Sequence, residues 1–243
     1  MEKPNTVIDS MFKAGTHFGF SRSRRHPTVT PYIFGVKNKV EIFDLEKTSL
    51  LLAEAKKFVA SVAAEGKQIV LVGGKHEARA AIRAAALSIN MPFVEDRWVG
   101  GTFTNFKEVR KRIDKLEKLE DQREKGELVK YTKKERLMID REIDRLSHLF
   151  SGIASIKDMP KAVFVVDPRA EKIAVKEAQD MCIPVIALAG SDCDISGITY
   201  PIVGNDASQE SIRFFVNEIV RAYEEGKANK SKVESAESKV DKK

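Results

Sequence analysis

Five short apolar runs alternate with helical patterns along this chain, and this alternation limits the folds that it can adopt. The runs cover residues 68–72, 92–94, 162–166, 184–188 and 200–203. A strand that is apolar at every position is buried on both faces, which is typical of a parallel sheet covered by helices. Apolar residues at three- and four-residue spacing predict those helices at residues 45–65, 77–90, 171–181 and 208–225. The sequence therefore predicts a doubly wound α/β fold.

One insertion, residues 105–150, interrupts this alternation. Of its 46 residues 25 are charged, which leaves too few apolar positions for a globular core. The apolar residues form two narrow stripes at helical spacing. They are Phe106, Val109, Ile113, Leu116 and Leu119 in the first stripe and Ile139, Ile143, Leu146 and Phe150 in the second. Such stripes predict an antiparallel coiled-coil hairpin, whose charges form a solvated face or an arm for a protein partner.

These patterns divide the chain into four parts. Residues 1–43 form a basic N-terminal segment, residues 44–104 and 151–226 one discontinuous α/β domain, and residues 105–150 the hairpin insertion. From about residue 227, Lys, Glu, Ser and Ala dominate and no aromatic residue appears. Such a composition cannot bury enough apolar surface to order itself, so we expect residues 227–243 to be a disordered tail.

The charge of the chain is concentrated at its N-terminus. Residues 1–40 carry seven basic and two acidic residues, a surplus of five, whereas the net charge of the whole chain is +6. This surplus favours a polyanionic partner. Two cysteines without a paired motif indicate a reducing compartment, and no apolar run is as long as a membrane span or a signal sequence. We expect a cytoplasmic protein with no membrane partner.

Residues typical of catalysis are scarce. The best candidate is Gly73-Gly74-Lys75, a turn from a strand into a helix that could cradle a phosphate. It lacks the third glycine of a dinucleotide motif and the ending of a phosphate-binding loop. The four histidines lie in separate contexts, so their spacing predicts no metal site. We expect no enzyme, cofactor or small-molecule substrate; the alternative is a nucleotide-binding α/β enzyme with a strand-end pocket near Gly73 and Asp192.

The connection at residues 97–107 carries groups that suit RNA. Arg97 can bind phosphates, and Gly100 and Gly101 permit a close approach of the backbone. Side chains that can contact phosphate or sugar oxygens follow: Thr102, Thr104, Asn105 and Lys107. Trp98, the only tryptophan, is expected to pack the loop in place rather than to stack on a base. The plainer interpretation is a tight turn around that tryptophan.

Two further basic segments lie in the N-terminal part. Arg22, Arg24 and Arg25 crowd into four positions without a neighbouring acid, and prolines hold the following chain extended. Residues 32–42 predict a β-hairpin with a basic turn. The turn residues are Lys37, Asn38 and Lys39. Both segments suit contacts with the backbone of structured RNA better than contacts with a small metabolite.

Four separated motifs occur along the chain in a fixed order. They are Lys13-Ala14-Gly15-Thr16-His17-Phe18-Gly19, then Pro31-Tyr32-Ile33-Phe34-Gly35 running through Asn38-Lys39 to Asp44-Leu45-Glu46-Lys47-Thr48, then Arg97-Trp98-Val99-Gly100-Gly101-Thr102 with Thr104-Asn105, and Pro201 to Asn205-Asp206. Together, over about residues 5–225, they resemble the S2 family of small-subunit ribosomal proteins. The inserted hairpin is similar to the bacterial and organellar form of that family.

The resemblance implies a flavodoxin-like, Rossmann-like parallel sheet of five strands with a protruding coiled coil and no enzymatic activity. It also implies a place between the head and the body of the small ribosomal subunit. There the protein would contact rRNA and neighbouring ribosomal proteins and, in bacteria that have it, dock ribosomal protein S1. We therefore expect a structural rRNA-binding constituent of the small subunit that supports translation. A protein-interaction scaffold that acts through the hairpin is a third alternative.

The chain departs from the family where some members hold a metal ion. Phe20 stands where a second histidine is common in the family. The segment from Gly190 to Ile195 replaces the usual Asp-Thr-Asn-x-Asp-Pro run. We therefore expect no metal site in this chain.

Overall fold

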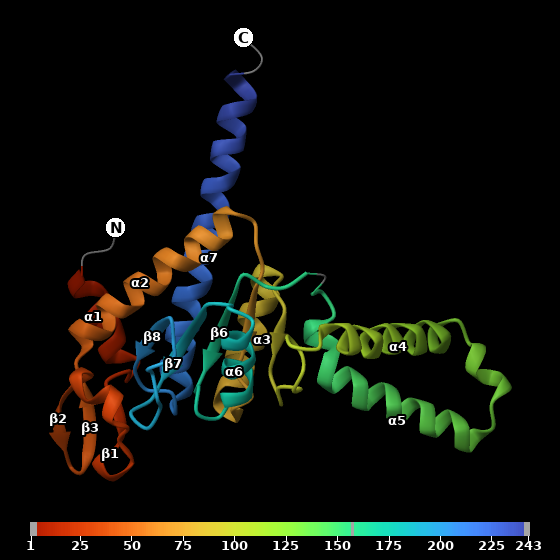
Figure 1. Cartoon of the computed structure of the whole chain (residues 1–243), viewed down its shortest axis with the longest axis horizontal. Coiled ribbons are helices and arrows are strands. Elements are labelled where there is room, and N and C mark those ends of the chain that lie inside the picture. The colour runs from red at the N-terminus through yellow and green to blue at the C-terminus, as the bar shows by residue number, and fades with distance from the viewer. Residues whose placement is uncertain (1–3, 157, 241–243) are drawn as a thin grey trace.

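A five-stranded parallel sheet forms the centre of the molecule (Figure 1). The computed structural model describes residues 4–156 and 158–240, and the strand order is β5-β4-β6-β7-β8. Every neighbouring pair in this sheet runs parallel. The strands are β4 (Ile69–Val72), β5 (Phe93–Val94), β6 (Ala162–Val166), β7 (Val185–Ala189) and β8 (Tyr200–Val203). The predicted α/β fold is confirmed, and the strands lie within a residue or so of the five apolar runs.

Helices cover both faces of this sheet because successive strand residues point to opposite sides. Phe164 of β6 packs in one buried cluster with residues of α2 (Leu45–Ala64), α3 (His76–Ile89) and α7 (Gln209–Val240). Its neighbour Val165 packs in a second cluster with residues of α6 (Lys172–Asp180). This second cluster also contains Trp98 and the base of the inserted hairpin. None of the described helices is long and apolar enough to cross a membrane.

The N-terminal part packs against α2 and contributes Met11, Val29 and Phe43 to the two buried clusters. It contains α1 (Pro4–Lys13), then β1 (Phe18–Ser21), β2 (Ile33–Lys37) and β3 (Val40–Phe43), which form an antiparallel sheet in the order β1-β3-β2. The predicted hairpin is present. Its two-residue turn places Asn38 at φ 51° and Lys39 at φ 65°, the left-handed conformation that such turns require. Residues 1–3 lie outside the described residues.

The insertion forms two helices, α4 (Phe106–Glu124) and α5 (Lys133–Phe150), that project away from the sheet side by side (Figure 1). Thr132 starts α5 with a reciprocal capping box, because its hydroxyl accepts from the Glu135 amide and the Glu135 carboxylate accepts from the Thr132 amide. Most of the two predicted stripes is buried between the helices. The buried members are Val109, Ile113, Leu116, Ile143, Leu146 and Phe150.

The C-terminal tail differs from our expectation of disorder. α7 continues as one helix to Val240, and residues 241–243 lie outside the described residues. The segment after Gly226 contains no further glycine or proline and is rich in good helix formers. A helix that is already nucleated by packing extends at low cost, because each added residue gains one hydrogen bond.

We expect the outer hairpin to be dispensable for folding of the sheet. Val109 and Phe150 at its base belong to the buried cluster of the sheet, so the base must be kept. Replacing residues 114–142 by a short Gly/Ser linker is expected to leave one cooperative thermal transition, because the removed stripes bury mainly each other. A non-cooperative transition, measured by circular dichroism, would show that the outer hairpin belongs to the folding unit of the sheet.

Candidate nucleic-acid interface

The connection from β5 to α4 is held together by one buried carboxylate. Glu177 of α6 is 7% exposed and accepts four hydrogen bonds from this connection. Its Oε1 accepts from the Trp98 indole at 3.3 Å and from the Gly101 amide at 2.6 Å. Its Oε2 accepts from the amides of Phe103 at 3.0 Å and Thr104 at 3.5 Å. The backbone donors of this loop therefore bind the protein's own carboxylate.

The residues proposed for RNA contact in this loop differ in their exposure to solvent. Arg97, Thr104, Asn105 and Lys107 are exposed. Thr102 is not: it is 1% exposed, and its hydroxyl donates to the Val99 carbonyl at 2.6 Å. The prediction that Thr102 faces RNA is therefore wrong, because the turn uses its hydroxyl to close itself.

Trp98 occupies the inner side of the same loop. Its side chain is 3% exposed, and its ring meets that of Phe103 edge-on, with the centroids 4.8 Å apart. The tryptophan packs the loop onto α6, as predicted from the sequence. A stacking contact with a base would require the loop to open.

The arginines of the N-terminal segment fall into two kinds. Arg22 and Arg24 are exposed, and the Arg24 guanidinium lies 5.7 Å from the centre of the Phe20 ring. Arg25 instead approaches Glu41 of β3 at 3.3 Å. The Glu41 side chain is completely buried and has no hydrogen-bond partner among the described residues. Arg25 therefore neutralises a buried charge and fixes the segment, while its two neighbours point into solvent.

The basic turn between β2 and β3 is exposed to solvent. Lys37, Asn38 and Lys39 are all exposed, as are Phe34 and Val36 on the strand before them. Figure 1 shows this turn near one end of the molecule and the α4–α5 hairpin at the other. Since the 97–107 loop leads into α4, the structure does not bring the turn and this loop into one compact site.

Arg24 lines a hollow near Asp192, together with an arginine that sequence analysis did not single out. A hollow of about 630 Å³ is lined by Ser23, Arg24, His26, Arg169 and Asp192. Arg169 follows β6 directly in the segment Asp167-Pro168-Arg169, at the carboxyl end of a parallel strand, where ligand-binding groups gather in such sheets. This position directly after a predicted strand could have indicated Arg169 as a candidate site residue. Sequence analysis did not single out Glu41, which stands between Val40 and Ile42, or Glu177, which follows Lys176.

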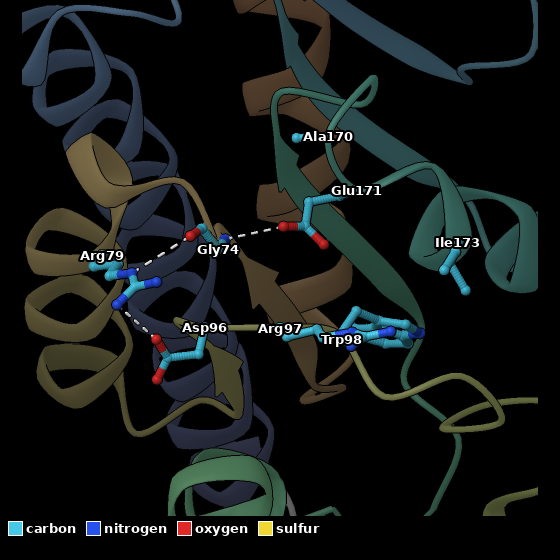
Figure 2. A pocket seen from close by; sticks show the side chains of 8 residues that line it. All are labelled: Gly74, Arg79, Asp96, Arg97, Trp98, Ala170, Glu171 and Ile173. Atoms are coloured by element: carbon cyan, nitrogen blue, oxygen red, sulfur yellow. Dashed lines mark hydrogen bonds and ion pairs between the residues drawn. The ribbon is translucent and has the colours of Figure 1, made fainter.

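The turn at Gly73 and Gly74 is already filled by side chains of the protein (Figure 2). Figure 2 shows Glu171 reaching the Gly74 amide, which donates to its Oε1 at 3.1 Å, and Arg79 reaching Asp96, with Nη1 and Oδ1 2.7 Å apart. Lys75 binds Asp167 and Asp206, with its Nζ 3.1 and 3.2 Å from the two carboxylates. Acidic side chains therefore already bind the Gly74 amide and the Lys75 ammonium, the two groups that a phosphate would need. This argues against a nucleotide-binding turn.

The same strand ends hold a cluster of potential metal ligands. One donor atom each from Asp167, Cys193 and Asp206 lies within 4.8 Å of the others. Burial raises the pKa of the Cys193 thiol, and the neighbouring carboxylates raise it further. Burial raises the pKa of Asp206 to about 6, although the Lys75 ammonium opposes the rise. The Lys75 ammonium already bridges the two carboxylates of this cluster, so a metal ion would have to displace it.

Phe20 and Gly190 lie beside this cluster. The Phe20 ring centre is 5.9 Å from the Lys75 Nζ, and the Phe20 amide donates to Ser191 Oγ at 2.9 Å. A Cβ at Gly190 would collide with the Asp206 carboxylate. The two positions at which the chain departs from the family, the usual second histidine and the first residue of the Asp-Thr-Asn-x-Asp-Pro run, therefore carry an aromatic ring and a glycine, both closely packed.

Comparison with known proteins decides the family. The model of the family described as "Ribosomal protein S2" matches residues 11–226. The chain belongs to the ribosomal protein S2 family. The small ribosomal subunit protein uS2 of Sulfurimonas denitrificans is 42% identical over 225 residues, which cover 93% of this chain and 87% of that protein. The uS2 protein of Chloroflexus aggregans is 38% identical over 220 residues, which cover 90% of this chain and 92% of that protein.

The S2 match covers most of the parts described above. It includes the N-terminal sheet, the central sheet, the loop held by Glu177 and the inserted hairpin, and it ends at residue 226, before the last part of α7. The resemblance stated from the sequence motifs is thereby confirmed. The S2 relatives are ribosomal proteins and not enzymes, which agrees with a strand-end turn filled by acids.

Proposed function

We propose that this chain, a structural constituent of the small ribosomal subunit by its family, binds the rRNA of that subunit between its head and its body. The observation that carries the proposal is the family match over residues 11–226. As a protein of translation in this family, the chain is not an enzyme. We further propose that it resides in the cytoplasm, on the small subunit.

The surface for RNA consists of exposed residues with no acidic partner. Five exposed cations form no ion pair within residues 4–156 and 158–240: Arg22, Lys37, Lys39, Arg97 and Lys107. Several cations along the hairpin, in contrast, pair with an acid of the protein itself. Arg and Lys that are not paired within the protein can neutralise phosphates without first giving up a carboxylate. Polar groups of Asn38, Thr104 and Asn105 stand beside them for sugar and phosphate oxygens. Arg24 completes this surface.

Neighbouring ribosomal proteins are the second class of partner that we propose, with ribosomal protein S1 among them in bacteria that have it. Large apolar side chains at the N-terminal sheet support a protein contact. Phe12 is 62% exposed and Phe34 81% exposed, and exposed aromatic groups of this kind are frequent in protein interfaces. The family resemblance, rather than this patch, suggests S1.

Reversing Arg22 and Arg24 to Glu is expected to weaken binding to small-subunit rRNA and to flatten its salt dependence. Each phosphate contact contributes about 0.7–0.9 to the slope of log affinity against log salt, so two lost contacts reduce the slope by about 1.4–1.8. The slope is measured by filter binding at several salt concentrations. Arg25 is left unchanged because Glu41 needs it.

The control for this experiment changes the charge equally elsewhere. Lys57 of α2 and Arg213 of α7 are exposed and form no ion pair in the part of the chain that the structure describes. Their double reversal to Glu is expected to leave the slope unchanged, apart from a small general loss of affinity. Equal slopes for both double variants would remove Arg22 and Arg24 from the interface.

A further inference from the structure

We propose that the hollow formed by Ser23, Arg24, His26, Arg169 and Asp192 binds one phosphate group of an RNA backbone. The proposal rests on the proposed rRNA binding and extends it to a site of defined chemistry. The hollow joins two parts of the chain that lie far apart in sequence, the turn after β1 and the carboxyl ends of β6 and β7. Its volume of about 630 Å³ lies within the range of sites that hold small ligands.

Arg169 is held in place by an acid and still has free donors. Its Nη1 donates to Asp192 Oδ2, and the Asp192 side chain is only 10% exposed. The Arg169 side chain is 62% exposed. A guanidinium has five N–H donors in a rigid fork, and one carboxylate oxygen engages one of them. The pair therefore holds the Arg169 guanidinium in place and leaves its remaining N–H donors for a ligand in the hollow.

Arg24 adds a second cation from the N-terminal segment. Its guanidinium lies over the Phe20 ring, a contact that leaves the N–H groups at the edge of its plane available. Two guanidinium groups and one carboxylate give the hollow a net charge of +1 when His26 is neutral. The hollow thus differs from the Gly74 turn: cations line the hollow, whereas the acid Glu171 already binds the Gly74 amide.

His26 supplies a further donor in its neutral form. The Thr28 amide donates to His26 Nδ1 at 3.4 Å, and the Thr28 hydroxyl lies 2.8 Å from the same nitrogen. Since Nδ1 accepts, Nε2 carries the ring hydrogen and is a donor on a residue that lines the hollow. Two arginine forks and a neutral imidazole match the acceptor oxygens of a phosphodiester.

Replacing Arg169 by Ala tests the site through the salt dependence of rRNA binding. Loss of one phosphate contact is expected to reduce the slope of log affinity against log salt by about 0.7–0.9. The conservative variant Arg169→Lys keeps the charge, so it is expected to retain the slope. Arg83→Ala is the matched control, because the Arg83 side chain is also 62% exposed and also pairs with one acid, Glu95. A cooperative thermal transition confirms that each variant is folded.

Three outcomes would overturn the proposal, and they can be told apart. An Arg169→Ala slope equal to that of the unmodified protein excludes a phosphate in the hollow. Failure of the unmodified protein to bind rRNA at all overturns the proposed function itself. Calorimetry with inorganic phosphate and ATP distinguishes the source of the phosphate. Micromolar binding of either one that is lost in Arg169→Ala would assign the hollow to a free ligand instead of RNA.

Discussion

Replacing Glu177 by Gln is expected to release the 98–104 loop from α6 and to destabilise the protein by about 3 kcal/mol. The carboxylate accepts four hydrogen bonds through two oxygens, whereas an amide offers one oxygen and directs an N–H₂ group at backbone donors. Hydrogen bonds to a charged group contribute about 1.5–3 kcal/mol each, and neighbouring ones are not additive. The exposed Arg97 and Lys107 lie in the connection that Glu177 fixes, so rRNA affinity is expected to fall as well.

The chain offers its own reporter for this change. Trp98 is the only tryptophan and is 3% exposed, so loosening of the loop is expected to shift the native-state emission spectrum towards that of hydrated indole. Glu218→Gln is the matched control, because Glu218 is 4% exposed and binds Lys56 and Arg221 away from this loop. Urea unfolding should show destabilisation in both variants, and only Glu177→Gln should move the spectrum. An unchanged spectrum in that variant would contradict the role of Glu177.

Replacing Arg25 by Met is expected to destabilise the protein by about 3 kcal/mol. The substitution leaves the Glu41 carboxylate fully buried without its cation, and breaking a buried pair from one side costs about 3–5 kcal/mol. We expect a loss at the lower end of this range because the Arg25 side chain is 25% exposed. Urea unfolding measures the loss. Arg22→Met, at an exposed arginine of the same turn, is expected to change the free energy of unfolding by less than about 0.5 kcal/mol.

The double variant Arg25→Met with Glu41→Met separates the ion pair from simple packing. Replacing both partners by apolar side chains removes the unpaired charge, so most of the lost stability is expected to return. A double variant as unstable as Arg25→Met alone would show that packing of the arginine stem, and not neutralisation of Glu41, accounts for the effect.

The central sheet could be predicted from the sequence because its strands are buried on both faces. The run Ala162–Val166 has no polar position, and only a strand covered on both sides explains that composition. The hairpin was predictable for the related reason that two narrow apolar stripes in a charged segment favour packing of the two helices on each other. The antiparallel strand β1 was missed, since Phe18–Ser21 is short and half exposed and gains its order from pairing with β3.

The candidate interface was less predictable because single polar residues that we expected to be exposed are buried or paired within the protein. Thr102 and Arg25 have the same types of side chain as their exposed neighbours, and no local pattern distinguishes them. What distinguishes them is a distant partner: α6 brings the carboxylate that closes the turn around Thr102, and β3 brings the acid that holds Arg25. Such assignments depend on contacts between elements and not on sequence spacing.

The division of the core by the sheet has a consequence for experiments on this protein. The buried layer that contains Val165 also contains Val29 of the N-terminal segment, Trp98 of the loop and Phe150 at the base of the hairpin. The opposite layer, with Phe164, contains residues of α2, α3 and α7. Truncating a side chain of the first layer is expected to disturb the common support of the segments that we propose to contact RNA. Truncating one of the second layer is expected to lower stability with those segments still held. Substitutions at two adjacent positions of β6, Val165 and Phe164, therefore allow the proposed RNA binding and the stability of the protein to be varied separately.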